Sequence, residues 1–201
     1  MLSPVALATW IAFCVPQADP KLLHVLATVG SGGEAYLITE AGGQTRVPAS
    51  LPEGIRWLGR DIPGERHIGL TQIPAATLRQ IGIPQEVALP ECANLAIGWQ
   101  LWSDAHMAAQ VKQKTPMKAI SLAFARFHDR QEALETPYSQ KAVDMVLNFR
   151  PVAPAPLGSP LYFEVAAAAA NHHAMLLRLE FPGSQLGSAA ALAQWSRTLL
   201  R

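Results

Sequence analysis

The chain has 201 residues, with 16 Lys and Arg against 15 Asp and Glu, and a formal net charge of +1. Charged residues make up 15% of the sequence and hydrophobic residues 50%, which excludes a disordered polyelectrolyte and indicates a chain that can bury a core. The near-neutral charge also argues against a nucleic-acid-binding protein, because such binding depends on a concentrated positive field.

The first half of the chain predicts two helices and a small β-hairpin. Apolar residues at helical spacing indicate helices over 4–13 and 20–29, and the glycine-rich run 30–33 ends the second. Alternating side chains predict a strand at 35–38, with its partner at 47–51 after a turn at the two glycines between them. The apolar start of the chain is too short to cross a bilayer and lacks a basic region, so we expect no transmembrane segment and only a weak export signal.

The second half predicts further helices and then a change of composition. Helices are expected over 74–82, 93–111, 115–127 and 137–149. Proline and alanine dominate residues 150–160, which predicts an extended linker, and residues 161–201 form an Ala-rich tail. We therefore expect a mainly α (α+β) fold with one domain over 1–149, followed by the linker and the tail.

Four strings along the first domain share the order and spacing of a known family. The strings are Cys14-Val15-Pro16 followed by Asp19-Pro20, then Gly30-Ser31-Gly32-Gly33, then Gly69-Leu70-Thr71-Gln72-Ile73, and finally Pro90-Glu91-Cys92-Ala93-Asn94-Leu95-Ala96-Ile97-Gly98. Together they resemble the lytic transglycosylases of type IV secretion and conjugation systems, which have a goose-lysozyme-like fold. The resemblance covers residues 4–149.

The resemblance also bears on the two cysteines and on the location of the protein. From the residues alone, Cys14 and Cys92 are either free buried thiols or a disulfide. The resemblance implies that they pair, and it implies a periplasmic protein whose partners are peptidoglycan glycan strands and subunits of a type IV secretion apparatus. The residues show no Cys/His cluster at metal-ligand spacing, so we expect no metal and no cofactor.

The resemblance breaks at the residue that carries the chemistry of such enzymes. They use one glutamic acid to protonate the bond between the two amino sugars and then to accept a proton from the 6-hydroxyl, which closes a 1,6-anhydro ring. Here that position is Gly30, which has no proton to give. The Tyr-Asn-x-Gly turn beside the acid aligns with Phe127-His128-Asp129-Arg130, while Tyr138 resembles a later tyrosine. The sequence thus favours a degenerate enzyme.

Either a nearby glutamate or an adjacent histidine and aspartate could replace the missing acid. Glu34 lies four residues after Gly30 and Glu40 lies ten after it, and Glu34 is the more plausible replacement. His128 and Asp129 are adjacent, and neighbouring helical residues point in different directions, so we do not expect them to act as a couple.

The remaining candidates are residues that would contact the glycan. The resemblance places Gln72, Ser31, Phe127, His128 and Tyr138 near the sugar, with structural packing as the other reading for each. Trp57 is the best candidate for stacking on a sugar ring, because it lies in the region between the predicted helices.

Three functions remain open. The first is a degenerate transglycosylase-like protein that binds or locally remodels peptidoglycan for a secretion, conjugation or pilus apparatus. The second is an active transglycosylase whose acid has moved, most plausibly to Glu34. The third is a non-enzymatic adaptor whose Ala-rich tail docks a partner.

Overall fold

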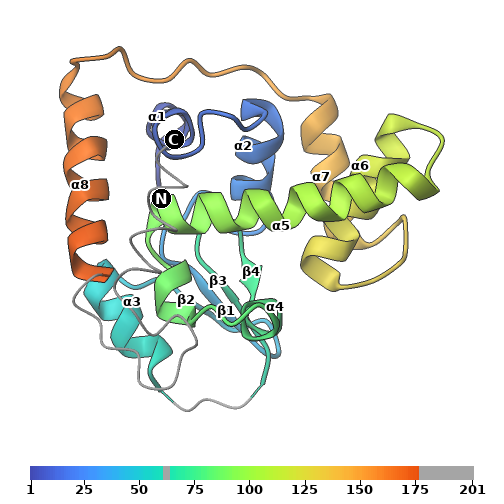
Figure 1. The fold of residues 1–201 in the computed structure, drawn as a ribbon, viewed down its shortest axis with the longest axis horizontal. Coiled ribbons are helices and arrows are strands. Elements are labelled where there is room, and N and C mark those ends of the chain that lie inside the picture. Colours follow the sequence, from blue (N-terminus) through green and yellow to red (C-terminus); the bar gives the residue numbers. More distant parts are fainter. Residues whose placement is uncertain (61–63, 177–201) are drawn as a thin grey trace.

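A computed structural model describes residues 1–60 and 64–176, and it is mainly helical with a small antiparallel sheet, as predicted (Figure 1). The helices are α1 (Pro4–Cys14), α2 (Pro20–Val29), α3 (Leu51–Leu58), α4 (Ala75–Gln80), α5 (Glu91–Lys112), α6 (Pro116–Phe124), α7 (Pro137–Leu147) and α8 (Pro160–Leu176). Single turns are the 3₁₀ turn η1 (Gln85–Ala88) and the π-helical turn η2 (Ala125–Asp129). The strands are β1 (Ile38–Glu40), β2 (Thr45–Arg46), β3 (Arg66–Ile68) and β4 (Ile73–Pro74).

The N-terminal helices begin where the sequence predicts. Ser3 accepts a hydrogen bond from the backbone N–H of Ala6 at 3.2 Å, and Asp19 accepts one from Leu22 at 3.0 Å. In both helices proline follows the capping residue, where its missing N–H costs nothing. These caps set the direction of α2, whose last turn leads to Gly30.

The sheet is larger than the predicted hairpin, and one predicted strand is wrong. Its strand order is β2-β1-β3-β4, with each neighbouring pair antiparallel. The partner of β1 is Thr45–Arg46 rather than 47–51, because α3 begins at Leu51. Gly42 and Gly43 make the turn with φ of +83° and +80°, a conformation that favours glycine.

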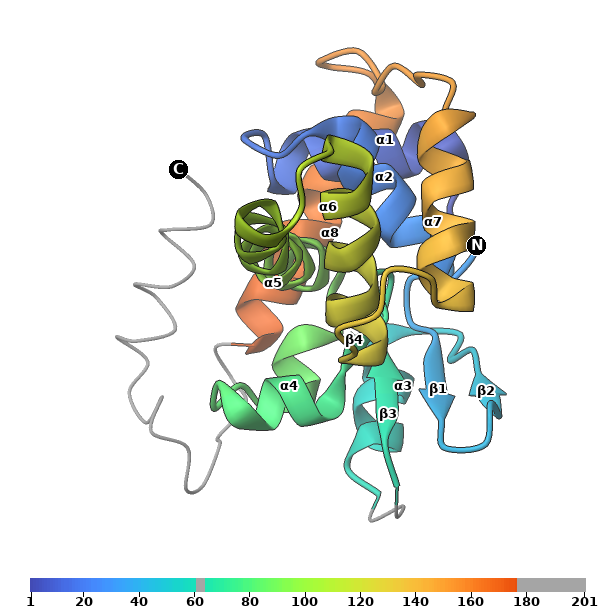
Figure 2. The same cartoon turned by 90° about the vertical axis from the view of Figure 1, so that its right-hand side faces the viewer.

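Helix α5 runs through the middle of the molecule. Helices α1, α2 and α7 lie on one side of it, and the sheet with α3 and α4 lies on the other (Figures 1 and 2). One apolar core joins the two sides; its fully buried members include Leu23 and Leu26 of α2, Ile38 and Ile68 of the sheet, and Leu95 of α5. In this arrangement the C-terminal end of α2 and the N-terminal end of α7 face the sheet.

Cys14 and Cys92 form a disulfide, as the resemblance implies. It joins the end of α1 to the start of α5, with the two Cα atoms 5.1 Å apart and a sequence separation of 78 residues. Such bonds persist in oxidising compartments. Among the helices in residues 1–60 and 64–176, none combines the length and hydropathy needed to cross a membrane.

Helix α8 returns to the domain after an extended segment. It packs along α1 (Figure 1), and its Val165 is buried in the common core. Nδ1 of His172 lies 3.0 Å from Oε2 of Glu91, whose carboxylate is buried. The other oxygen of that carboxylate, Oε1, accepts a hydrogen bond from the Tyr36 hydroxyl at 2.7 Å. The predicted boundary near residue 150 stays a prediction, and residues 177–201 of the predicted tail lie outside the described residues.

Candidate functional site

A cavity of about 540 Å³ lies where the C-terminal end of α2 and the N-terminal end of α7 face the sheet. Turn η2, the β1–β2 hairpin and β3 complete its wall, and Figure 2 shows the lower end of α7 above β1. The lining residues are Val29, Gly30, Thr39, Glu40, Ala41, Gly42, Gly43, Glu65, His67, Gln72, His128, Pro137, Tyr138 and Lys141. Gly30, Gln72, His128 and Tyr138, all singled out from the sequence, therefore meet at one place.

The position expected to hold the acid has no room for a side chain. Gly30 has an ordinary right-handed backbone, with φ of −95° and ψ of −42°, so conformation does not demand a glycine. A Cβ atom added there would lie 2.9 Å from Cγ of Gln72, 3.2 Å from its Cβ and 3.4 Å from Cε2 of Tyr138. Packing against these two side chains therefore accounts for the glycine.

Gln72 is held rigidly in that place. Its Oε1 accepts a hydrogen bond from Oγ1 of Thr39 at 2.6 Å, and its Nε2 donates to the carbonyls of Leu37 at 3.1 Å and Gly69 at 2.8 Å. It is 2% exposed and has φ of +52°, a left-handed conformation that costs a non-glycine residue of order 1 kcal/mol. Its amide thus joins the hairpin to the loop after β3, and only one lone pair of Oε1 is left without a hydrogen bond.

Three rings are stacked in the wall of the cavity, and one of them, Tyr138, adjoins Gly30. The His67 and His128 rings have centroids 4.4 Å apart and planes 19° apart, and the His128 and Tyr138 rings are 3.7 Å and 9° apart. Nε2 of His67 also lies 3.3 Å from the backbone carbonyl oxygen of His128. The stack joins β3, η2 and α7 and fixes the plane of the middle ring.

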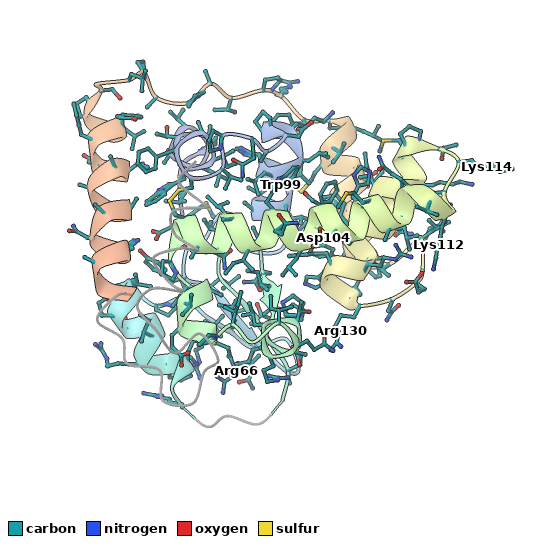
Figure 3. The ribbon with its side chains drawn as sticks, in the orientation of Figure 1. Arg66, Trp99, Asp104, Lys112, Lys114 and Arg130 are labelled. Atoms are coloured by element: carbon teal, nitrogen blue, oxygen red, sulfur yellow. A yellow bond between two sulfur atoms is a disulfide. The ribbon has the colours of Figure 1, made fainter. Side chains whose placement is uncertain are left out.

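His128 and Asp129 meet, contrary to the expectation that adjacent side chains would diverge. Nδ1 of His128 lies 2.8 Å from Oδ1 of Asp129. The reason is local: the chain forms a π-helical turn here and ends it at Arg130 in the left-handed region, with φ of +55° (Figure 3). Burial lowers the pKa of His128, and the bond to Asp129 opposes this effect in part.

Two buried polar atoms beside this pair have no partner among the described residues. They are Oδ2 of Asp129 and the hydroxyl of Tyr138. Burial raises the pKa of Tyr138, and the negative charge of Asp129 raises it further. Unpaired buried polar atoms are uncommon, and they are often bridged by an ordered water or a ligand.

The charges of the cavity are divided between its two sides. Lys141 follows Tyr138 by three residues on α7 and donates from Nζ to the carbonyl of Val29 at 2.8 Å, next to Gly30. On the sheet side, Glu65 accepts bonds from the Ala76 N–H at 2.7 Å and from Arg79 at 3.2 Å. A cation therefore lies beside the position where the family has its carboxylate.

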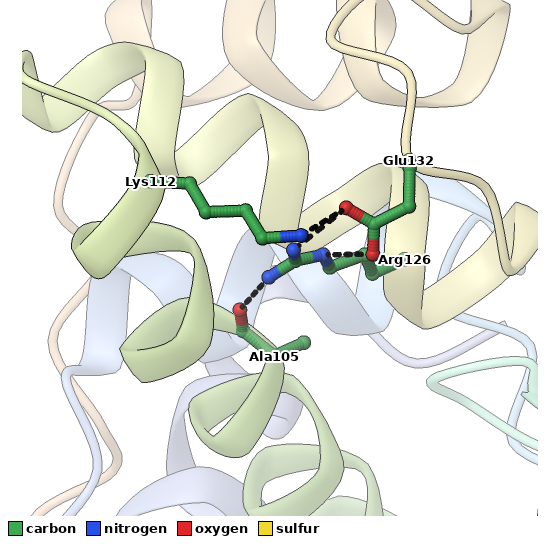
Figure 4. A network of polar contacts seen from close by, with 4 residues as sticks. All are labelled: Ala105, Lys112, Arg126 and Glu132. Carbon is green, nitrogen blue, oxygen red and sulfur yellow. Dashed lines mark hydrogen bonds and ion pairs between the residues drawn. The ribbon is translucent and has the colours of Figure 1, made fainter.

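A surface network secures the turn that carries His128 (Figure 4). The carboxylate of Glu132 accepts hydrogen bonds from Nε of Arg126 at 2.9 Å, from Nη2 of Arg126 at 2.8 Å and from Nζ of Lys112 at 3.0 Å. The hydrogen bonds from Arg126, followed by that from Lys112, lower the pKa of Glu132 to about 2. Because Arg126 belongs to η2 and Lys112 to α5, the network links the turn η2 to the central helix α5.

Four residues predicted from the sequence lie outside the cavity lining. Glu34 pairs with the amino group of Met1 at 2.6 Å. Ser31 is buried, donating to the carbonyl of Ala27 at 2.7 Å and accepting from Gly33 at 3.0 Å. Phe127 is buried in the core.

The fourth is Trp57, the predicted stacking residue. Its indole N–H donates to Oε1 of Glu40 at 3.0 Å, and the guanidinium carbons of Arg46 and Arg60 lie 4.9 and 4.0 Å from its ring centroid. Through Glu40, which lines the cavity, Trp57 supports the hairpin. Its role in sugar stacking stays a prediction.

Sequence reasoning missed three of the titratable residues that line the cavity. Lys141 was detectable, because it lies one turn after Tyr138 on a predicted helix and must share its face. His67 and Glu65 lie in a segment for which no strand was predicted, so nothing in the pattern placed them near the cleft. Within residues 1–60 and 64–176, no group of three or more side chains is arranged to hold a metal ion.

No protein-family model, curated protein or solved structure matches this chain. The cavity and its residues are therefore the basis on which a function is argued.

Proposed function

We propose that this protein is a transglycosylase-like protein with a lysozyme-like fold that binds peptidoglycan glycan strands in the cavity without the acid chemistry of that family. The observation that carries the proposal is the closed position at Gly30, in a cavity that otherwise stays open at about 540 Å³. That volume is within the range of small-ligand sites. A periplasmic role beside a type IV secretion, conjugation or pilus apparatus is part of the proposal.

The charge of Lys141, on the α7 side of the cavity, supports a glycan that carries carboxylates. Lys141 projects from α7 beside Gly30 and keeps donor capacity after its bond to Val29, since an ammonium group has three protons. Muramic acid has a free lactyl carboxylate in peptide-free strands, and the stem peptides that are otherwise joined to it by an amide bond carry carboxylates of their own. The ammonium group of Lys141 attracts such anions, whereas Glu40 and Glu65 lie on the sheet side of the cavity, bonded to Trp57 and Arg79.

Binding to purified sacculi tests the proposal, with a matched pair of charge reversals. Lys141→Glu places a carboxylate in the cavity, whereas Lys114→Glu makes the same change in the exposed loop after α5 (Figure 3). We expect Lys141→Glu to weaken binding by at least about fivefold and Lys114→Glu to leave it unchanged. Equal binding by both variants, or no binding by the native protein, contradicts the proposal.

Product analysis tests the absence of cleavage. We expect no clearing in zymograms and no 1,6-anhydro products from the native protein. We also expect none from Gly30→Glu, because Gln72 and Tyr138 already occupy the space for its Cβ.

Anhydro products from the native protein would favour the alternative, an active enzyme with a relocated acid. Glu34 is paired outside the cavity, so Glu40, which lines it, becomes the residue to change to Gln. Loss of the products in Glu40→Gln would identify that acid.

A further inference from the structure

The imidazole of His128 has one ring nitrogen engaged and one open. A carboxylate only accepts hydrogen bonds, so the 2.8 Å contact between Nδ1 and Asp129 requires the proton to be on Nδ1. Nε2 has no bond to any described residue and is not among the buried unpartnered atoms. Since His128 lines the cavity, Nε2 is exposed there.

The surroundings keep this ring neutral and in one orientation. Its two faces are stacked between His67 and Tyr138, and burial disfavours the protonated form. A neutral imidazole with its proton on Nδ1 has a lone pair on Nε2. The cavity therefore presents a fixed hydrogen-bond acceptor in addition to the ammonium group of Lys141.

We propose that His128, oriented by Asp129, is a binding residue that accepts a hydrogen bond from a sugar hydroxyl through Nε2. The chemistry selects the partner: a hydroxyl donates to an imidazole lone pair, whereas a carboxylate is repelled by it. Asp129 is a positioning residue, since it reaches the ligand only through the ring of His128. This inference rests on the proposed glycan binding and adds the group that recognises the sugar ring itself.

Unpartnered atoms next to His128 support the same assignment. Oδ2 of Asp129 and the Tyr138 hydroxyl are both buried without a partner among the described residues. The polar groups that adjoin the ring of His128 are therefore incomplete without a further hydrogen-bond partner.

Calorimetric titration with peptide-free glycan strands measures the contribution of Nε2. His128→Phe keeps a stacked ring but has no acceptor, and we expect it to weaken binding about tenfold. The control is His106→Phe, because His106 also stacks on an aromatic ring, that of Trp102 at 4.8 Å, and lies outside the cavity. His128→Gln, whose amide oxygen accepts hydrogen bonds, is expected to bind better than His128→Phe.

Nitrogen chemical shifts of His128 give a readout that needs no ligand. In the native protein at pH 7.5 they are expected to report the proton on Nδ1. In Asp129→Asn the side-chain amide donates to Nδ1, so the proton is expected on Nε2 and binding is expected to fall together with this change. A merely structural role of Asp129 would leave the tautomer unaltered.

The outcomes separate this inference from the proposed function. If the native protein binds glycan strands and His128→Phe binds equally well, the inference is wrong and the proposed function stands. A native tautomer with the proton on Nε2 also overturns the inference alone. Failure of the native protein to bind any glycan contradicts the proposed function, and the assignment of a sugar hydroxyl falls with it.

Discussion

The Asn94 amide in the core and the polar groups around His128 differ in how fully they are hydrogen-bonded. Asn94, which is 0% exposed, donates to the carbonyls of Ile68 at 2.9 Å and Ala88 at 2.7 Å, and it accepts from the N–H and hydroxyl of Thr71, each at 2.8 Å. Every hydrogen-bonding position of its amide is used. Around His128, by contrast, Asp129 and Tyr138 each leave a buried polar atom without a partner among the described residues.

The comparison shows what each region is organised to do. Asn94 joins two of the strings recognised in the sequence, since Thr71 belongs to one and Asn94 to the other. Gly69, with φ of +73°, is a glycine because the Asn94 side chain occupies the space of its Cβ. The Asn94 network is thus complete in itself, although Trp102 of α5 keeps a buried unpaired N–H elsewhere in the core, whereas the wall of the cavity combines unpaired buried atoms with the open Nε2 of His128.

The largest expected effect is at Asn94. Asn94→Ala removes the side-chain partner of two buried carbonyls and of the Thr71 N–H, and leaves the Thr71 hydroxyl only its 3.3 Å bond to the backbone carbonyl of residue 94, so we expect the free energy of unfolding to fall by about 3–5 kcal/mol. Urea denaturation measures it. The control is Asn148→Ala, since Asn148 is exposed and makes only a local bond to the Asp144 carbonyl at 2.9 Å, and its change is expected to stay within about 0.5 kcal/mol. Similar losses for both would mean that the central network is not a special source of stability.

Removing the disulfide tests whether the central region needs a covalent tie. The Cys14–Cys92 bond closes a loop with a sequence separation of 78, and replacing both cysteines by serine is expected to cost about 2–4 kcal/mol. The unfolding of the double variant should match that of the native protein measured with reductant. A loss under about 0.5 kcal/mol would show that core packing alone holds α1 against α5.

A single methyl group at Gly30 tests how tightly the cavity floor is packed. Gly30→Ala places Cβ 2.9 Å from a Gln72 side chain that three hydrogen bonds hold, so we expect a loss of about 1–2 kcal/mol. Gly59→Ala is the control, because Gly59 also has right-handed backbone and its nearest neighbours are 3.8 Å away. Its stability is expected to stay equal or rise slightly. Equal results for the two variants would mean that Gln72 gives way easily and that position 30 is not closed.

The parts that were predictable from the sequence are those with local signals. Capping residues and helical spacing located α1, α2 and α7, and Gly42-Gly43 located the hairpin turn. Strands β3 and β4 were missed because they are only three and two residues long and pair with distant segments. The contact between His128 and Asp129 was missed because it depends on a π-helical turn, which no periodic pattern predicts.

The smallest expected effect is at the surface network behind η2. Glu132→Gln removes a carboxylate whose pKa falls from 4.5 to about 2 in the folded protein, chiefly through its bonds to Arg126. Because the folded-state pKa is the lower one, the contribution of Glu132 is complete above pH 4.5 and is lost as the pH falls toward 2. The melting temperature of the native protein should therefore be slightly higher than that of the Glu132→Gln variant at pH 7, and the difference should shrink below pH 4.5.

The same variant shows whether the network acts on the cavity. Glu132 is fully exposed, but it is bonded to Arg126, which is two residues from His128 on the same turn. If the network only secures the surface, the His128 nitrogen shifts stay as in the native protein while the pH-dependent difference in melting temperature remains. Changed shifts would mean that the exposed network sets the geometry of the Asp129–His128 pair, which would join the two regions that are otherwise separate.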